Sequence, residues 1–261
     1  MIPADMEAVI LAGGMGTRLR EETEIRPKPM VQIGGIPILL HIMRLYRRFG
    51  VKRFVVCLGY KGDIIRDYFV NYRLHHSDLE VDLSTSAVRV LGDVAPLDFS
   101  VVLVETGAET LTGSRIARAL KHVRSDTFFA TYGDGVADID MTALYETHRI
   151  AGKLGTVTAV HPPSRFGEID IDGRDVRTFR EKPQIAEGWI NGGFMVLRKA
   201  ALASISPDDA GRSLEVDVLP KLADQGQLAV HKHGGFWQCM DTYRDMTLLN
   251  ELWAAGKAPW A

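Results

Sequence analysis

The feature that most constrains the fold is a series of apolar, β-rich segments separated by segments of helical period. These apolar segments lie at about residues 7–12, 53–58, 99–104, 126–131 and 155–160. Between the first two, apolar residues recur at helical spacing from position 38 to 49 and stop at Gly50. Residues 54–58 are apolar throughout, which is typical of strands buried on both faces. We therefore expect an α/β fold with a Rossmann-like, mostly parallel mixed sheet between helices, and ligands at the carboxyl ends of its strands.

The pattern changes after about residue 160. Shorter apolar runs follow at 168–171, 176–180, 189–197 and 227–232. They predict a smaller β-rich region at about 161–240 that covers the edge of the sheet as a lid. A helix at about 241–255 carries an apolar stripe that we expect to pack back onto the core. The whole chain, 1–261, is thus expected to form one domain, with its core at about 7–160 and a closing segment at 241–261.

Charge and cysteine content exclude several classes of protein. With 31 basic and 33 acidic residues the formal net charge is −2, so no nucleic-acid partner is expected. Cys57 and Cys239 are the only cysteines and lie far apart, which suggests two packed thiols and neither a disulfide framework nor a zinc site. No apolar run is long enough to cross a bilayer. We therefore expect no membrane partner and a cytoplasmic location.

A glycine-rich turn directly follows the first apolar segment. It contains Gly13, Gly14 and Gly16, and Arg18 and Lys28 come shortly after. Glycines let several backbone N–H groups approach phosphate oxygens, and the two cations can neutralise phosphate charge. The turn has no third Rossmann glycine, and Lys28 lies too far along the chain for a P-loop. A tight turn without a ligand is the alternative, but the two cations favour a nucleoside triphosphate site.

An acidic turn follows the apolar segment at 126–131. Asp134 lies where a parallel strand ends, and a carboxylate there can hold Mg²⁺ beside phosphates. Asp138 and Asp140 are expected to be N-caps of a helix that begins near Met141. Taken alone, Asp241 is interpreted in the same way, as the N-cap of the last helix.

Polar turns in the second half offer hydrogen-bonding groups for a hydroxyl-rich ligand. Gly167, Glu181, Lys182 and Asn191 lie in or beside these turns. Glutamate accepts, asparagine donates, and glycine allows close approach. Each signal is weak alone, because Glu181 and Lys182 also fit a solvated ion pair.

Together these segments resemble the sugar-nucleotide pyrophosphorylases. Residues 11–19 match the nucleotide signature of that family, and residues 27–30 match its lysine motif. Residues 131–138, 190–194, 236–238 and 240–242 are similar to the branch of glucose-1-phosphate cytidylyltransferases. The similarity extends from about residue 7 to Trp260.

The resemblance implies that CTP and α-D-glucose 1-phosphate react, with Mg²⁺, to give CDP-glucose and pyrophosphate for the dideoxysugars of surface polysaccharides. It implies Arg18, Lys28 and Asp134 as catalytic residues, and Asp134 with Asp241 as metal ligands, which replaces the capping role of Asp241. The residues that it implies for nucleotide binding are Leu11, Ala12, Gly13, Gly14, Gly16, Thr17, Arg18, Lys28, Thr110, Arg115 and Gly133. Those that it implies for the sugar phosphate are Gly167, Glu181, Lys182 and Asn191, with Gly133 at their side of the site.

Some alternatives remain open. Ser114 stands where the family commonly has a second glycine, so another base or another sugar 1-phosphate is an alternative. A second alternative is a catalytically silent homologue that only binds sugar nucleotides. The joint presence of Arg18, Lys28, Asp134 and Asp241 argues against it. The resemblance also implies a homo-oligomer, with a hexamer as the candidate assembly.

Overall fold

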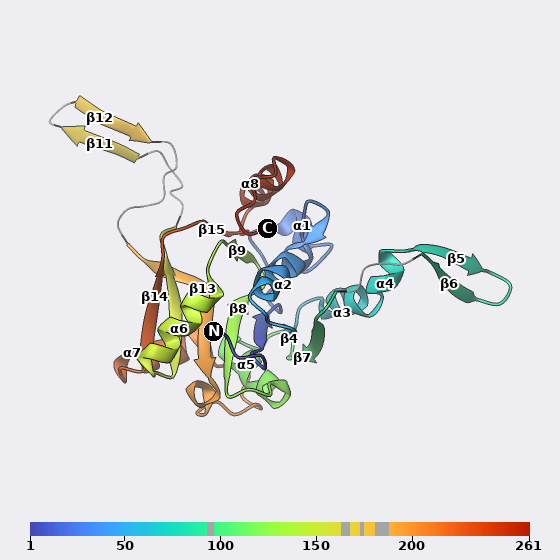
Figure 1. Cartoon of the computed structure of the whole chain (residues 1–261), viewed down its shortest axis with the longest axis horizontal. Coiled ribbons are helices and arrows are strands. Elements are labelled where there is room, and N and C mark those ends of the chain that lie inside the picture. The colour runs from blue at the N-terminus through green and yellow to red at the C-terminus, as the bar shows by residue number, and fades with distance from the viewer. Residues whose placement is uncertain (93–96, 163–167, 173–174, 181–187) are drawn as a thin grey trace.

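The fold is built around a seven-stranded sheet. The computed structural model describes residues 1–92, 97–162, 168–172, 175–180 and 188–261, and it describes segments 168–172 and 175–180 by their backbone only. In spatial order its strands are β14 (Leu228–His233), β10 (Gly155–Val160), β13 (Ile190–Arg198), β8 (Thr127–Tyr132), β1 (Ala8–Leu11), β4 (Arg53–Leu58) and β7 (Ser100–Glu105), as Figure 1 shows. Each neighbouring pair is parallel except those of β13, which runs antiparallel to both β10 and β8. The predicted mostly parallel mixed sheet is confirmed.

Helices cover both faces of this sheet. One face packs against α2 (Ile38–Arg48) and α6 (Met141–Ala151), and Leu249 of α8 (Tyr243–Ala254) belongs to the same core cluster. The other packs against α5 (Thr112–Ala119), a π-helical turn at Leu214–Val218 and α7 (Leu219–Asp224). Within β1, Ala8 and Ile10 belong to the first core and Val9 and Leu11 to the second. Because each face of the strand meets a helical layer, its sequence is apolar without alternation.

The second half of the chain differs from its predicted arrangement. Strands β13 and β14 belong to the main sheet, so the prediction of a separate β-rich region over the edge is wrong for both. The reason lies in β13, whose residues from Gly192 to Leu197 are all buried, which suits a strand between two others. β11 (Glu168–Asp172) and β12 (Asp175–Arg180) pair with each other outside the main sheet, and their role as a lid stays a prediction.

Smaller elements lie outside the main sheet. They are α1 (Arg20–Thr23), β2 (Gln32–Ile33), β3 (Ile36–Pro37), α3 (Gly62–Val70), α4 (Tyr72–His75), β5 (Asp78–Asp82), β6 (Ala87–Leu91), β9 (Gly135–Ala137), β15 (Trp237–Cys239) and 3₁₀ turns at Lys28–Met30, Leu120–His122 and Lys199–Leu202. The hairpin β5–β6, which the sequence analysis does not anticipate, projects away from the sheet (Figure 1). Among the described residues, no helix combines the length and apolar character that a bilayer span requires.

The expected helix ends are partly confirmed. Asp140 caps α6 by accepting hydrogen bonds from the backbone N–H groups of Thr142 and Ala143. Asp138 is not a cap, because its carboxylate pairs with His233 at 3.0 Å. In α8, Leu249 is buried and Met246, Leu252 and Trp253 pack partly buried against the core, whereas Leu248 stays 40% exposed.

Candidate active site

A pocket of about 470 Å³ opens where β1 and β8 end. All the residues expected to bind the nucleotide line it: Leu11, Ala12, Gly13, Gly14, Gly16, Thr17, Arg18, Lys28, Thr110, Arg115 and Gly133. Asp134 and Asp241 line it as well. The structure therefore brings together groups that are spread over 231 positions of the chain, from Leu11 to Asp241.

The glycine-rich turn can take its shape only with glycine at position 16. Gly16 has a φ of 62°, in the left-handed region, and an added Cβ would lie 2.8 Å from Cγ2 of Thr23 and 3.2 Å from Cβ of Lys28. The Thr23 hydroxyl donates to the carbonyl oxygens of Gly16 at 3.1 Å and Leu19 at 2.9 Å. This contact fixes the turn against α1 and against the stem of Lys28.

The Lys28 ammonium group lies between two carboxylates. Its backbone is held between Pro27 and Pro29 in the 3₁₀ turn, which limits its movement. Its Nζ lies 2.7 Å from Oδ2 of Asp134 and 2.5 Å from Oδ1 of Asp241, and its side chain is only 11% exposed. Burial opposes the charge of the ammonium group, but the attraction of Asp134 and the hydrogen bonds to both carboxylates outweigh it and raise the pKa of Lys28.

A short antiparallel ladder brings the two aspartates together. Strands β9 and β15 pair Gly135 with Cys239, and the N–H of Met240 donates to the carbonyl oxygen of Asp134 at 2.8 Å. Asp134 lies one residue before this ladder and Asp241 two residues after it, so the ladder sets the separation of the two carboxylates. The N-cap of α8 is Thr242, which forms a capping box with Asp245, so the interpretation of Asp241 as the cap is wrong.

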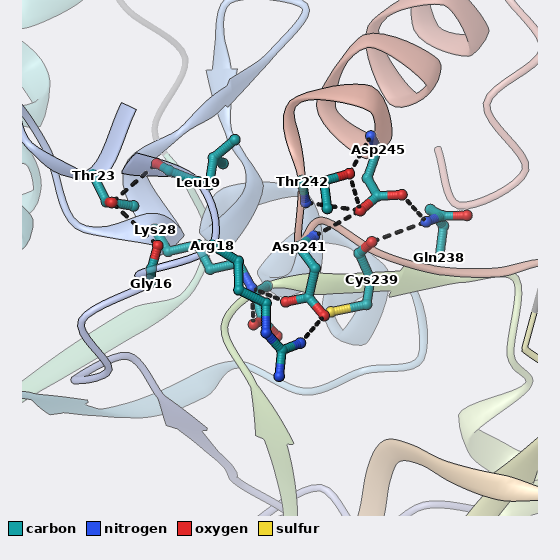
Figure 2. Close-up of polar contacts among 11 residues, drawn as sticks. Gly16, Arg18, Leu19, Thr23, Lys28, Gln238, Cys239, Asp241, Thr242 and Asp245 are labelled. Carbon is teal, nitrogen blue, oxygen red and sulfur yellow. Dashed lines mark hydrogen bonds and ion pairs between the residues drawn. The ribbon is translucent and has the colours of Figure 1, made fainter. Parts of the chain in front are cut away.

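Arg18 extends the ionic network to the mouth of the pocket. Its Nη1 donates to Oδ2 of Asp241 at 2.9 Å, and its side chain is 72% exposed (Figure 2). Burial raises the pKa of Asp241, but the hydrogen bond and charge of Lys28 and the charge of Arg18 have the larger combined effect, and the pKa lies below its usual value. Asp241 is therefore ionised at neutral pH.

Arg115 acts as a brace between the loops that form the pocket wall. It is 4% exposed, and its guanidinium donates to the carbonyl oxygens of Leu58 (3.0 Å), Gly107 (2.7 Å), Ala108 (3.0 Å) and Gly13 (3.1 Å), and to the hydroxyl of Thr106 (2.8 Å). A Cβ on Gly13 would collide with this guanidinium. Thr110 lies beside it and accepts a hydrogen bond from Arg118 at 2.8 Å. Contact of Arg115 and Thr110 with CTP stays a prediction.

A second polar network lines the pocket, and the sequence analysis assigns it no role. Glu215 accepts hydrogen bonds from the hydroxyls of Thr112 (2.6 Å), Ser213 (2.8 Å) and Tyr132. Burial raises the pKa of Glu215, but the three hydroxyl donors lower it further, so the carboxylate is ionised. Glu215 lies in the π-helical turn Leu214–Val218, whose sequence contains no recognisable motif, so no sequence signal marks it. Tyr132 is the last residue of β8 and lies two residues before Asp134. This position at the end of a strand is the sequence signal that could have indicated a role for Tyr132.

The residues expected at the sugar phosphate are less well placed by the structure. Gly167, Glu181 and Lys182 lie outside the described residues. Asn191 is exposed on β13, and its Oδ1 accepts a hydrogen bond from the N–H of Gly193 at 3.0 Å. Asn191 is not among the residues that line the pocket. The sugar-binding role of these four residues stays a prediction.

The carboxylates of the site fit a divalent cation. Ligand atoms of Asp134, Cys239 and Asp241 all lie within 4.8 Å of one another. Carboxylate oxygens are the ligands that Mg²⁺ prefers, and Mg²⁺ usually keeps waters and substrate phosphates as its other ligands. Cys239 is partly buried beside them and has no disulfide partner, and Cys57 is a buried core thiol.

Comparisons with known proteins agree with this geometry. Residues 7–254 match the family described as Nucleotidyl transferase. The chain is 49% identical over 257 residues to the glucose-1-phosphate cytidylyltransferase of Salmonella typhi, covering 98% of each protein. It is 42% identical over 255 residues to the probable glucose-1-phosphate cytidylyltransferase of Bacillus subtilis, covering 98% of this chain and 99% of the relative.

A solved structure supports the same assignment. HddC from Yersinia pseudotuberculosis, complexed with GMP-PN, superposes with a TM-score of 0.70 at 26% identity, covering 95% of this chain and 99% of HddC. The family match spans nearly the whole chain, and the pocket contains the glycine-rich turn and lysine of the expected signature. The chain therefore belongs to the nucleotidyl transferase family.

Proposed function

We propose that this chain transfers CMP from CTP to α-D-glucose 1-phosphate, giving CDP-glucose and pyrophosphate, with Mg²⁺ as the metal. The similarity to two glucose-1-phosphate cytidylyltransferases along almost their full length supports the choice of substrates. The observation that carries the proposal is the convergence of Arg18, Lys28, Asp134 and Asp241 on the pocket below the glycine-rich turn.

The proposed reaction needs no side-chain nucleophile. A phosphate oxygen of glucose 1-phosphate is already an anion, and it attacks the α-phosphorus of CTP while the bond to the β-phosphate oxygen breaks. The electron pair leaves with pyrophosphate. Catalysis then depends on positioning two polyanions and stabilising the charge of the transition state.

Each residue of the site has a role in this scheme. Backbone N–H groups of the glycine-rich turn bind phosphate oxygens, as glycine-rich nests do. Arg18 and Lys28 donate to the triphosphate and stabilise charge on the phosphoryl oxygens. Asp134 and Asp241 would hold Mg²⁺, and a bound Mg²⁺ would neutralise phosphate charge. Lys182, Glu181, Gly167 and Asn191 are proposed to bind the sugar phosphate.

A panel of nucleotides and sugar 1-phosphates tests the proposal. Pyrophosphate release should be fastest with CTP and α-D-glucose 1-phosphate, and another preferred pair would reassign the specificity within the family. A protein that binds CTP but releases no pyrophosphate with any sugar phosphate would instead be a binding homologue. Sedimentation velocity tests the proposed homo-oligomer.

A further inference from the structure

We propose that Lys28 is an internal counter-ion that occupies the place of the divalent cation in the free protein, so that cation and triphosphate must bind together. This inference rests on the proposed function, because it assigns a triphosphate to the pocket. It adds to that function a free-energy coupling between two ligands of one site. The following contacts carry it.

The two carboxylates already bind protein cations. Lys28 contacts Oδ2 of Asp134 at 2.7 Å and Oδ1 of Asp241 at 2.5 Å, and Arg18 contacts Oδ2 of Asp241 at 2.9 Å. At least three of the four carboxylate oxygens therefore accept a charged hydrogen bond. Such charge-assisted bonds are about twice as strong as neutral ones.

An ammonium group and a divalent cation cannot share this space. The candidate ligand atoms lie within 4.8 Å of one another, and Mg²⁺ binds oxygen at about 2.0–2.1 Å. A cation bound to both aspartates would thus lie where Lys28 now contacts them, and the two positive charges would repel strongly at that separation. Binding of the cation therefore requires Lys28 to leave.

The structure also indicates where the ammonium group goes. Pro27 and Pro29 restrict the backbone of Lys28, and its Cβ and Cδ lie 3.2 Å and 3.6 Å from the place of a Cβ on Gly16. The stem is thus held against the glycine-rich turn, and the end of the side chain can rotate into the pocket. Oxygens of a triphosphate in that pocket would replace the carboxylates as acceptors.

The exchange makes the two ligands cooperative. A free cation binds weakly because it must displace Lys28, and a metal-free triphosphate binds weakly because Lys28 and Arg18 are held by the carboxylates. When both arrive, each ligand releases the groups that the other needs. By linkage, the effect of the triphosphate on the cation equals that of the cation on the triphosphate.

Binding of Mn²⁺ alone, followed by the electron paramagnetic resonance of the free ion, tests the inference without a nucleotide. Lys28→Met should bind Mn²⁺ at least tenfold more tightly than the unmodified protein. Lys61→Met is the matched control and should bind Mn²⁺ unchanged, because Nζ of Lys61 donates to the backbone carbonyls of Thr23 and Glu24 and contacts neither carboxylate of the site. Equal affinity of Lys28→Met and the unmodified protein overturns the inference.

If Lys28→Met fails to fold, Arg18→Met decides the question, because the Arg18 side chain is mostly exposed and folding does not depend on it. Severalfold tighter Mn²⁺ binding supports the competition, and unchanged binding overturns it.

Titration of CTP in the presence of EDTA is a second measurement. Asp241→Asn should bind metal-free CTP severalfold more tightly than the unmodified protein, since it removes the carboxylate charge that holds Arg18 and one of the two that hold Lys28. Weaker or equal binding contradicts the coupling. If the unmodified protein binds CTP neither in EDTA nor with Mg²⁺ present, the proposed function fails, and the Mn²⁺ result still decides the role of Lys28.

Discussion

Replacement of Arg115 by methionine is expected to cost about 3–5 kcal/mol of the free energy of unfolding, the range for breaking a buried charged network. The change removes all five N–H donors while keeping much of the side-chain volume. Among the described residues, the carbonyl oxygens of Gly107 and Ala108 lose their donor. The other three acceptors lose one hydrogen bond each, and the carbonyl oxygens of Leu58 and Gly13 keep the backbone N–H groups of Thr106 and Tyr60. A buried acceptor without a partner costs about 1–3 kcal/mol, and water or relaxation recovers part of that sum.

The size of this loss makes it easy to measure. For a chain of this length, a destabilisation of 3–5 kcal/mol corresponds to a fall of roughly 10 °C in Tm. Urea unfolding followed by circular dichroism and tryptophan fluorescence gives the free energy directly. Arg89→Met is the matched control, because Arg89 forms its ion pair with Glu80 on an exposed hairpin and is itself 72% exposed. Its unfolding midpoint should not change.

If Arg115→Met lowers the free energy of unfolding by less than about 1 kcal/mol, the reasoning is refuted. A single buried acceptor without a partner already costs about 1–3 kcal/mol. Such a result would mean that water satisfies the carbonyl oxygens of the pocket wall. The guanidinium would then be free to act mainly as a ligand for the nucleotide. The experiment therefore separates a bracing role of Arg115 from a purely ligand-binding one.

Three further predictions concern the ionic network. Lys28→Ala should lower turnover by orders of magnitude, measured as pyrophosphate release, while its far-UV circular dichroism stays unchanged; near-normal turnover would remove Lys28 from the mechanism. Asp134→Ala should lose the Mg²⁺-dependent activity, and an Mg²⁺ titration curve like that of the unmodified protein would reject the metal assignment. The folded-state pKa of Asp241 lies below its unfolded value of about 3.9, so its contribution to stability is present above that pH and is lost as pH falls through the folded pKa. Asp241→Asn should therefore flatten the decline of stability below about pH 4 in urea unfolding at stepped pH, whereas a parallel decline in both proteins would contradict the pKa shift.

Local patterns in the sequence predict much of the core. The strands β1, β4, β7, β8 and β10 lie within a residue or two of their apolar segments, and α2 ends just before Gly50. These elements are predictable because burial on both faces of a parallel sheet leaves a continuous apolar signal in the chain itself. The placement of β13 is not predictable in that way. Its apolar run indicates burial, but nothing local indicates which neighbours it inserts between.

The same distinction applies to the site. The glycine-rich turn, Arg18 and Lys28 are close in sequence, and their spacing predicts a shared pocket. The approach of Asp241 to Asp134 depends on the three-residue ladder between β9 and β15, whose strands are too short to leave a periodic signal. From residues alone Asp241 therefore looks like a helix cap, and only the family resemblance places it at the metal. Glu215 was missed because its importance comes from three hydroxyl donors that the fold brings to it.

The ladder between β9 and β15 also determines when, during synthesis of the chain, the ionic network of the active site can form. Asp241 lies 213 positions after Lys28, so all seven strands of the main sheet are synthesised before this second acid. Nascent chains that end before β15 would contain the glycine-rich turn and Lys28 but would lack Asp241, and so could not form the complete ionic network. Translation products that end before Asp241 should therefore be inactive.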